Sequence, residues 1–133
     1  MATSRGVNTY RRTSISSAPP HRILDECFNR ALIDLAKARE AIAKRDAEGK
    51  GKALGNVLAI LGELETALDQ KAAPQMTRNL SRLYRYARDA VLEAGQKMSP
   101  KPLAHVEQIL CMLRAAFAEA ASKVAANNDG KTR

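Results

Sequence analysis

The side chains best suited to chemistry in this chain are two histidines and two cysteines. His21 and His105 lie far apart, and neither belongs to the His-x-x-Lys-Gly pattern of phosphotransfer helical bundles. Cys27 and Cys111 have no Cys or His at the spacing of a metal-ligand pair. The cysteines are therefore interpreted as free thiols in a reducing compartment, and histidine phosphotransfer is a weak alternative.

Catalytic motifs are absent from the sequence as well. It contains no Gly-rich phosphate loop and no nucleophile elbow, and no His-centred triad can be assembled from it. It also lacks the Glu-x-x-His pair that builds metal sites in bundle cores. We therefore expect a protein that is not an enzyme and that holds no cofactor and no metal.

Basic residues outnumber acidic ones, 22 to 14, and the formal net charge of +8 favours acidic partners. Arg78, Arg82 and Arg85 follow at steps of four and three residues, so on a helix they form one basic ridge. A solvated face is the simplest interpretation, while nucleic acid and an acidic protein remain alternative partners. Nucleic acid is the weaker of these, because acidic residues are interspersed along the other helices and base-reading helices usually add polar or stacking side chains.

Four amphipathic segments must position these side chains, and their apolar residues recur at three- and four-residue steps. The first helix is predicted from Pro19 and Pro20 to about Arg45, because proline suits the first turn of a helix. The second is predicted from Asp46, whose carboxylate can cap a helix, to about Leu68. The hydrophobic content is 45% with only 4% aromatic, so the core must be mainly aliphatic.

The third helix is predicted from Pro74 to Gly95, with Gly95 as the left-handed residue that ends it. The fourth is predicted from Ser99 to about Val124. Short connections make successive helices antiparallel, so the fold class is all-α, an antiparallel four-helix bundle. We assign residues 1–18 to a flexible N-terminal arm, residues 19–125 to the bundle and residues 126–133 to a disordered tail.

Several apolar residues fall outside the core-facing stripes. At 100° per residue, Ile33, Leu92 and Met112 point well away from their own stripes, while Tyr84 and Tyr86 flank the stripe of the third helix. Single exposed apolar residues are ordinary, but several together can form a groove for an amphipathic partner helix.

Membrane and secretion signals are also absent from the sequence. No apolar run approaches the ~20 residues of a transmembrane helix. No apolar stretch follows the N-terminal charges as it does in a secretory signal. We therefore expect a soluble, cytoplasmic protein without membrane insertion.

Several short segments occur in an order that matches a known family. They are Tyr10 ahead of Ser14–Pro20, Phe28–Asn29, Ala36–Ile42, Leu80–Tyr86 followed by Leu92–Ala94, Val106–Glu107 and Arg114–Phe117. In order and spacing they resemble the flagellin export chaperones of the FliS type, from Tyr10 to about Ala121. One departure is Arg85, which replaces the acidic residue that the family carries between its two tyrosines.

This resemblance implies a fold, a partner and a binding surface. The fold would be a four-helix bundle whose N-terminal arm covers part of that surface. The partners would be the disordered C-terminal segment of flagellin, kept from premature polymerisation, and the flagellar type III export apparatus. The implied client-binding residues are Tyr10, Ile15, Phe28, Asn29, Leu83, Tyr84, Tyr86 and Ala87. The alternative is a basic helical bundle that binds nucleic acid, which a steep salt dependence of binding would reveal.

Overall fold

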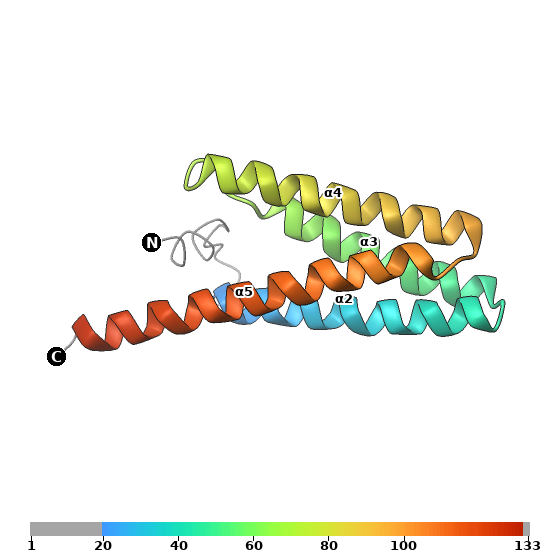
Figure 1. The fold of residues 1–133 in the computed structure, drawn as a ribbon, viewed down its shortest axis with the longest axis horizontal. Helices are drawn as coiled ribbons and strands as arrows, with labels where there is room; N and C mark the ends of the chain where they lie inside the picture. The colour runs from blue at the N-terminus through green and yellow to red at the C-terminus, as the bar shows by residue number, and fades with distance from the viewer. Residues whose placement is uncertain (1–19, 132–133) are drawn as a thin grey trace.

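The computed structural model of the chain describes residues 20–131, with side chains described for residues 21–123. Within this range it contains four helices and no strand: α2 (Pro20–Ala43), α3 (Ala47–Thr66), α4 (Pro74–Lys97) and α5 (Lys101–Lys131). Figure 1 shows consecutive helices running antiparallel. The predicted all-α four-helix bundle is confirmed, while the predicted arm, residues 1–18, lies outside the described residues.

The helices pack as a ring of four. The main contacts of α2 are with α3 and α5, and those of α4 are also with α3 and α5. The first and last of these helices are therefore neighbours, although they are far apart in the sequence. At their seam the rings of Phe28 and Phe117 stack with centroids 6.0 Å apart, and Arg39 and Glu107 form an ion pair at 2.7 Å.

The core between the four helices is largely aliphatic, as the composition predicts. Residues from the predicted apolar stripes of all four helices contribute to it. Its largest fully buried side chains include both aromatic and aliphatic residues: Tyr84, Phe28, Leu35, Leu61, Leu103 and Leu110. The predicted position of Tyr84 was wrong. The sequence placed its ring beside the stripe of α4, whereas the structure buries it completely. One residue corresponds to about 100° of rotation on a helix, so a sequence locates the edge of an apolar stripe only to within about one residue. A ring at that edge can therefore face the core.

The turn between α2 and α3 depends on two adjacent residues. α2 ends at Ala43. Two residues later, Arg45 takes a left-handed conformation with φ of 55°, which prevents the helix from continuing. Asp46 then caps α3 as predicted, because its carboxylate accepts a hydrogen bond of 3.0 Å from the backbone N–H of Gly49. A Cβ at Gly49 would meet that same carboxylate, which would have to shift from its place in the cap.

The predicted end of the third helix is wrong by a few residues. α4 continues through Gly95 to Lys97, and Met98, with φ of 50°, is the left-handed residue that closes it. Gly95 serves packing instead: a Cβ there would lie 3.3 Å from Leu54 Cδ1, and Lys50 Nζ donates a hydrogen bond of 2.9 Å to its carbonyl. The missing side chain lets α3 approach α4 closely.

The last helix begins as predicted and ends later. Ser99 Oγ accepts a hydrogen bond of 3.3 Å from the backbone N–H of Lys101, the first residue of α5. The helix passes Val124, where the sequence placed its end, and continues to Lys131 through part of the predicted tail. Ala125 and Ala126 favour helix and no proline follows, so the backbone continues past the last core residue. Figure 1 shows α5 projecting beyond the other helices.

Candidate functional site

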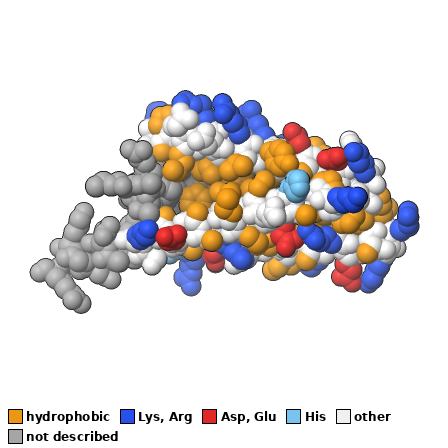
Figure 2. Space-filling model, in the orientation of Figure 1, with side chains coloured by type: hydrophobic (Ala, Val, Ile, Leu, Met, Phe, Trp, Pro, Cys, Tyr) orange, Lys and Arg blue, Asp and Glu red, His pale blue; other side chains and the backbone are white. Residues whose placement is uncertain are grey.

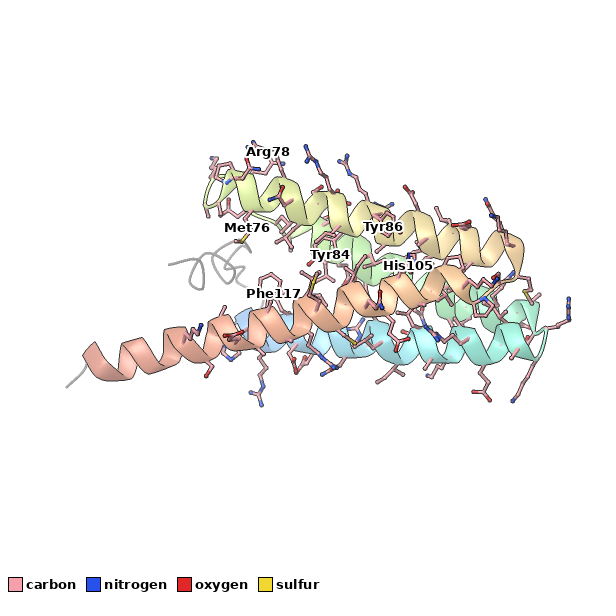
Figure 3. The ribbon with its side chains drawn as sticks, viewed as in Figure 1. Met76, Arg78, Tyr84, Tyr86, His105 and Phe117 are labelled. Carbon is pink, nitrogen blue, oxygen red and sulfur yellow. The ribbon has the colours of Figure 1, made fainter. Side chains whose placement is uncertain are left out.

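Apolar side chains gather on one face of the bundle, along the seam between α4 and α5. Figure 2 shows hydrophobic side chains there beside a histidine, which Figure 3 labels as His105. We call this surface the apolar strip and define it by three residues of α4 and two of α5: Met76, Leu83, Tyr86, Ile109 and Met112. Tyr86 and Met112 are exposed by 51% and 56%, and the other three are partly buried against the core.

Helix geometry explains why these five residues share a face. On α4, Leu83 and Tyr86 are three residues apart, and on α5, Ile109 and Met112 have the same spacing. The two helices are joined at the surface by Tyr86, whose hydroxyl lies 3.1 Å from Nδ1 of His105. This hydrogen bond holds the exposed phenol ring across the seam.

Three of the predicted site residues lie in the core rather than on this surface. Phe28, Tyr84 and Ala87 are fully buried. In Figure 3, Tyr84 lies on the side of α4 that faces α5 and Phe117. These three side chains are therefore part of the core, whereas Leu83 and Tyr86 form part of the apolar strip.

The remaining predicted residues lie elsewhere. Asn29 is half-buried at the α2–α5 seam, where its side-chain oxygen accepts a hydrogen bond of 2.6 Å from Nη1 of Arg114. Tyr10 and Ile15 lie outside the described residues. The sequence did not assign Met76, Ile109 or Met112 to the site, although the outward position of Met112 was visible in the helical periodicity. The shared strip could not be inferred without knowing that α4 and α5 are neighbours.

A hollow of about 610 Å³ opens near the start of α2, on the other side of α5 from the strip. Phe28, Phe117 and Ala121 form part of its apolar lining, and His21, Asp25 and Arg114 contribute polar groups. An apolar floor with a charged rim can accept an apolar side chain of a bound peptide.

Charged groups on α4 are partly neutralised by one residue of α3. Glu65 accepts hydrogen bonds from Ser81 (2.8 Å) and Arg85 (3.0 Å), and Arg88 lies 3.3 Å from its other oxygen. Burial opposes ionisation of this carboxyl, but the hydrogen bonds from Ser81 and Arg85 and the charges of both arginines outweigh it and lower the pKa of Glu65. Glu65 is therefore charged at neutral pH and links α3 to α4.

The Cys27 thiol is a candidate nucleophile, and the acidic groups are candidate metal ligands. Burial raises the pKa of the Cys27 thiol, with Arg30 opposing and two glutamates adding to the shift, so the thiolate nucleophile is disfavoured. No group of three His, Cys, Asp or Glu side chains within residues 21–123 could hold a metal ion. No described helix is both long enough and apolar enough to span a bilayer.

Comparison with known proteins identifies the family of this bundle. The family model described as flagellar protein FliS matches residues 3–124. The flagellar secretion chaperone FliS of Salmonella typhimurium is 29% identical over 128 residues, covering 92% of this chain and 95% of the relative. FliSB of Pseudomonas aeruginosa, also a flagellar secretion chaperone, is 29% identical, covering 88% and 96%, and FliS of Vibrio cholerae is 25% identical, covering 84% and 85%. The chain therefore belongs to the FliS family of flagellar secretion chaperones.

Proposed function

We propose that this protein captures the disordered C-terminal segment of flagellin on the apolar strip, in the cytoplasm, and holds it unpolymerised until the flagellar export apparatus receives it. The observation that carries this proposal is the strip itself, where Tyr86 and Met112 are each more than half exposed on adjoining helices. A chaperone acting in this way works by binding and needs no catalytic group.

The chemistry of the strip suits an amphipathic segment that folds as it binds. Such a segment loses conformational entropy on ordering, so it must gain free energy from many apolar contacts along its length. The methionines adapt their unbranched side chains to different partners, and Tyr86 offers a rigid ring with a polar tip. While its apolar face is covered by the strip, the segment cannot pack against other flagellin chains.

Tyr10 and Ile15 enter the proposal from the family resemblance alone. We infer that they belong to the same client surface, either by competing with the client or by contacting it. Deleting residues 1–16 is expected to change client affinity in one of these two directions while the bundle stays folded. Unchanged affinity would remove both residues from the site.

The direct test of the strip is a pair of matched variants. Tyr86→Ala and Met112→Ala, combined, remove exposed apolar groups from the strip. Leu92→Ala removes an apolar side chain of α4 that is exposed to a similar degree, 49%. The successive 100° rotation of an α-helix places Leu92 on the α3 side of α4, away from the strip. Binding of a synthetic C-terminal segment of the same organism's flagellin would be measured by fluorescence anisotropy.

The strip variant is expected to bind the segment at least about tenfold more weakly, because aromatic anchors dominate such interfaces. Leu92→Ala is expected to match the unaltered protein, and thermal melting should show all three folded. Equal affinity for all three proteins would place the client elsewhere on the bundle.

A further inference from the structure

Two exposed arginines of α4, Arg78 and Arg82, precede Tyr86 of the apolar strip, and we call them the row. Arg78, Arg82 and Tyr86 follow at four-residue steps on α4, so they are surface neighbours along one side of that helix. All three are exposed. Figure 2 shows basic side chains along the outer edge of α4, with other side chains and backbone between most of them and the hydrophobic group, and Figure 3 shows Arg78 near the start of that helix. A segment lying on the strip would therefore have this row along one flank.

Among the side chains of residues 21–123, no acidic group forms an ion pair with Arg78 or Arg82. Arg85 and Arg88 both pair with Glu65, whereas Arg78 donates its hydrogen bond of 2.8 Å to Gln75, which is neutral. Arg82 pairs with no acidic side chain within residues 21–123. Two guanidinium groups are thus available to carboxylates of a partner, which their fork of N–H donors can bind in a fixed geometry.

The opposite flank of the strip differs in charge. On α5 the residues at helical spacing from Met112, on its outward side, are Gln108, Ala115 and Glu119. None of these is a cation, and Glu119 is paired with Lys123 at 3.1 Å. Beside Met112 the strip is therefore bordered by neutral or paired side chains, and Lys101 is a cation further along this side of α5. On α4, Arg78 and Arg82 carry positive charge, and the exposed Asp89 follows them on the same side, three residues beyond Tyr86.

We propose that this charge asymmetry selects and orients the client: its strip-binding helix carries carboxylates on one flank of its apolar stripe, and this flank lies against Arg78 and Arg82. This inference rests on the proposed function and adds to it the charge pattern and the orientation of the bound segment. Charged groups at the rim of an interface act mainly on the rate of encounter and on specificity, so the row steers the client onto the strip.

An acidic peptide fits these observations better than nucleic acid does. A phosphate backbone is bound through a series of cations. Of the four arginines on this side of α4, Arg85 and Arg88 are already paired with Glu65. Tyr86 of the apolar strip is one helical turn beyond Arg82, and the exposed polar Gln75 and Asn79 lie between the two arginines and the rest of the strip. The strip itself suits the stripe of an amphipathic helix. The row and the strip together match one ligand with an apolar face and an acidic flank.

The test compares two double variants of equal net charge. Arg78→Gln with Arg82→Gln removes the row, while Lys37→Gln with Lys52→Gln removes two exposed lysines of α2 and α3, which line a hollow between those helices. Association and dissociation rates of the flagellin C-terminal segment would be measured by stopped-flow fluorescence at low and high salt.

The row variant is expected to associate about five- to tenfold more slowly at low salt, with dissociation changed less than about twofold. The difference should nearly vanish at high salt, where exposed charges are screened. The lysine variant should behave like the unaltered protein. Arg78→Glu with Arg82→Glu should reduce binding further, and a flagellin segment whose acidic residues are changed to lysine should restore it.

Unchanged association rates and unchanged salt dependence in the row variant would overturn the inference while leaving capture on the strip intact. Whether the strip binds the client is tested separately, by the combined Tyr86→Ala and Met112→Ala variant. A DNA duplex offered to the same proteins gives a further check. Tight, salt-sensitive DNA binding that only the row variant loses, with client binding unaffected, would assign the row to nucleic acid.

Discussion

At the scale of single residues, two tyrosines of α4 separated by one residue have different roles. A two-residue step turns a helix by about 200°, so Tyr84 lies in the core and Tyr86 on the surface. The family resemblance pointed to both residues, and only the packed structure distinguishes the one that fills the bundle from the one that can meet a partner.

Replacing each tyrosine by alanine should separate these roles. Tyr84→Ala is expected to lower the free energy of unfolding by about 3–5 kcal/mol, because it leaves a large cavity in the core. Tyr86→Ala should lower it by less than about 1 kcal/mol, the value of its exposed hydrogen bond to His105. Urea denaturation measures both. Equal destabilisation by the two changes would contradict the assignment of Tyr84 to the core.

At the scale of the helix, the sequence predicts where elements begin better than where they end. Pro20, Asp46 and Pro74 mark three starts correctly, because an N-terminal cap or proline acts within one turn. The end of α4 was missed because Gly95 was interpreted by its conformational freedom, whereas its role is the close approach of Leu54. That approach depends on tertiary packing and has no local signal.

The glycines of α3 give a test at this scale. Gly51 and Gly55 lie inside the helix with open space around the position of a Cβ. Changing either to alanine should therefore stabilise the protein by about 0.5–1 kcal/mol. Gly49→Ala should be destabilising instead, because its Cβ would meet the Asp46 carboxylate that caps the helix. Thermal denaturation of the three variants measures the difference, and the same sign for all three would contradict it.

The left-handed residue at the end of α2 offers a second test. Arg45 is exposed and has φ of 55°, a conformation that costs a residue with a side chain about 1–2 kcal/mol. Arg45→Gly is expected to stabilise the folded protein by up to about 1 kcal/mol, after the greater entropy of glycine in the unfolded chain is subtracted. Arg45→Ala serves as the control that removes the same charge, and it should not be stabilising.

At the scale of the whole molecule, the four-helix bundle and its largely aliphatic core were predictable from periodicity. The contacts between helices were not, because stripes show which side of a helix is buried but not which helix covers it. The apolar strip depends on such a contact: Tyr86 and His105 lie 19 positions apart in the sequence and meet at 3.1 Å. For that reason, part of the candidate site emerged only from the fold.

Global stability should depend on pH through Glu65. Its folded-state pKa lies below the ordinary value of 4.5, so its contribution is fully present above pH 4.5 and is lost as pH falls through the folded-state value. Glu65→Gln should therefore cost about 1 kcal/mol at neutral pH, and the difference from the unaltered protein should shrink in acid. Chemical denaturation at several pH values measures this, and a difference that persists unchanged at pH 3 would rule it out.

The ring of helices also affects the order of events during synthesis. Asn29 and Arg114 meet although they are 85 positions apart, so α2 has no α5 to cover it until that helix has left the ribosome. The strip needs α5 as well, since Ile109 and Met112 supply one side of it. A nascent chain that has exposed only its first three helices therefore shows uncovered core and has no complete surface for a client. The apolar strip and the last side of the core form in the same step, after α5 emerges.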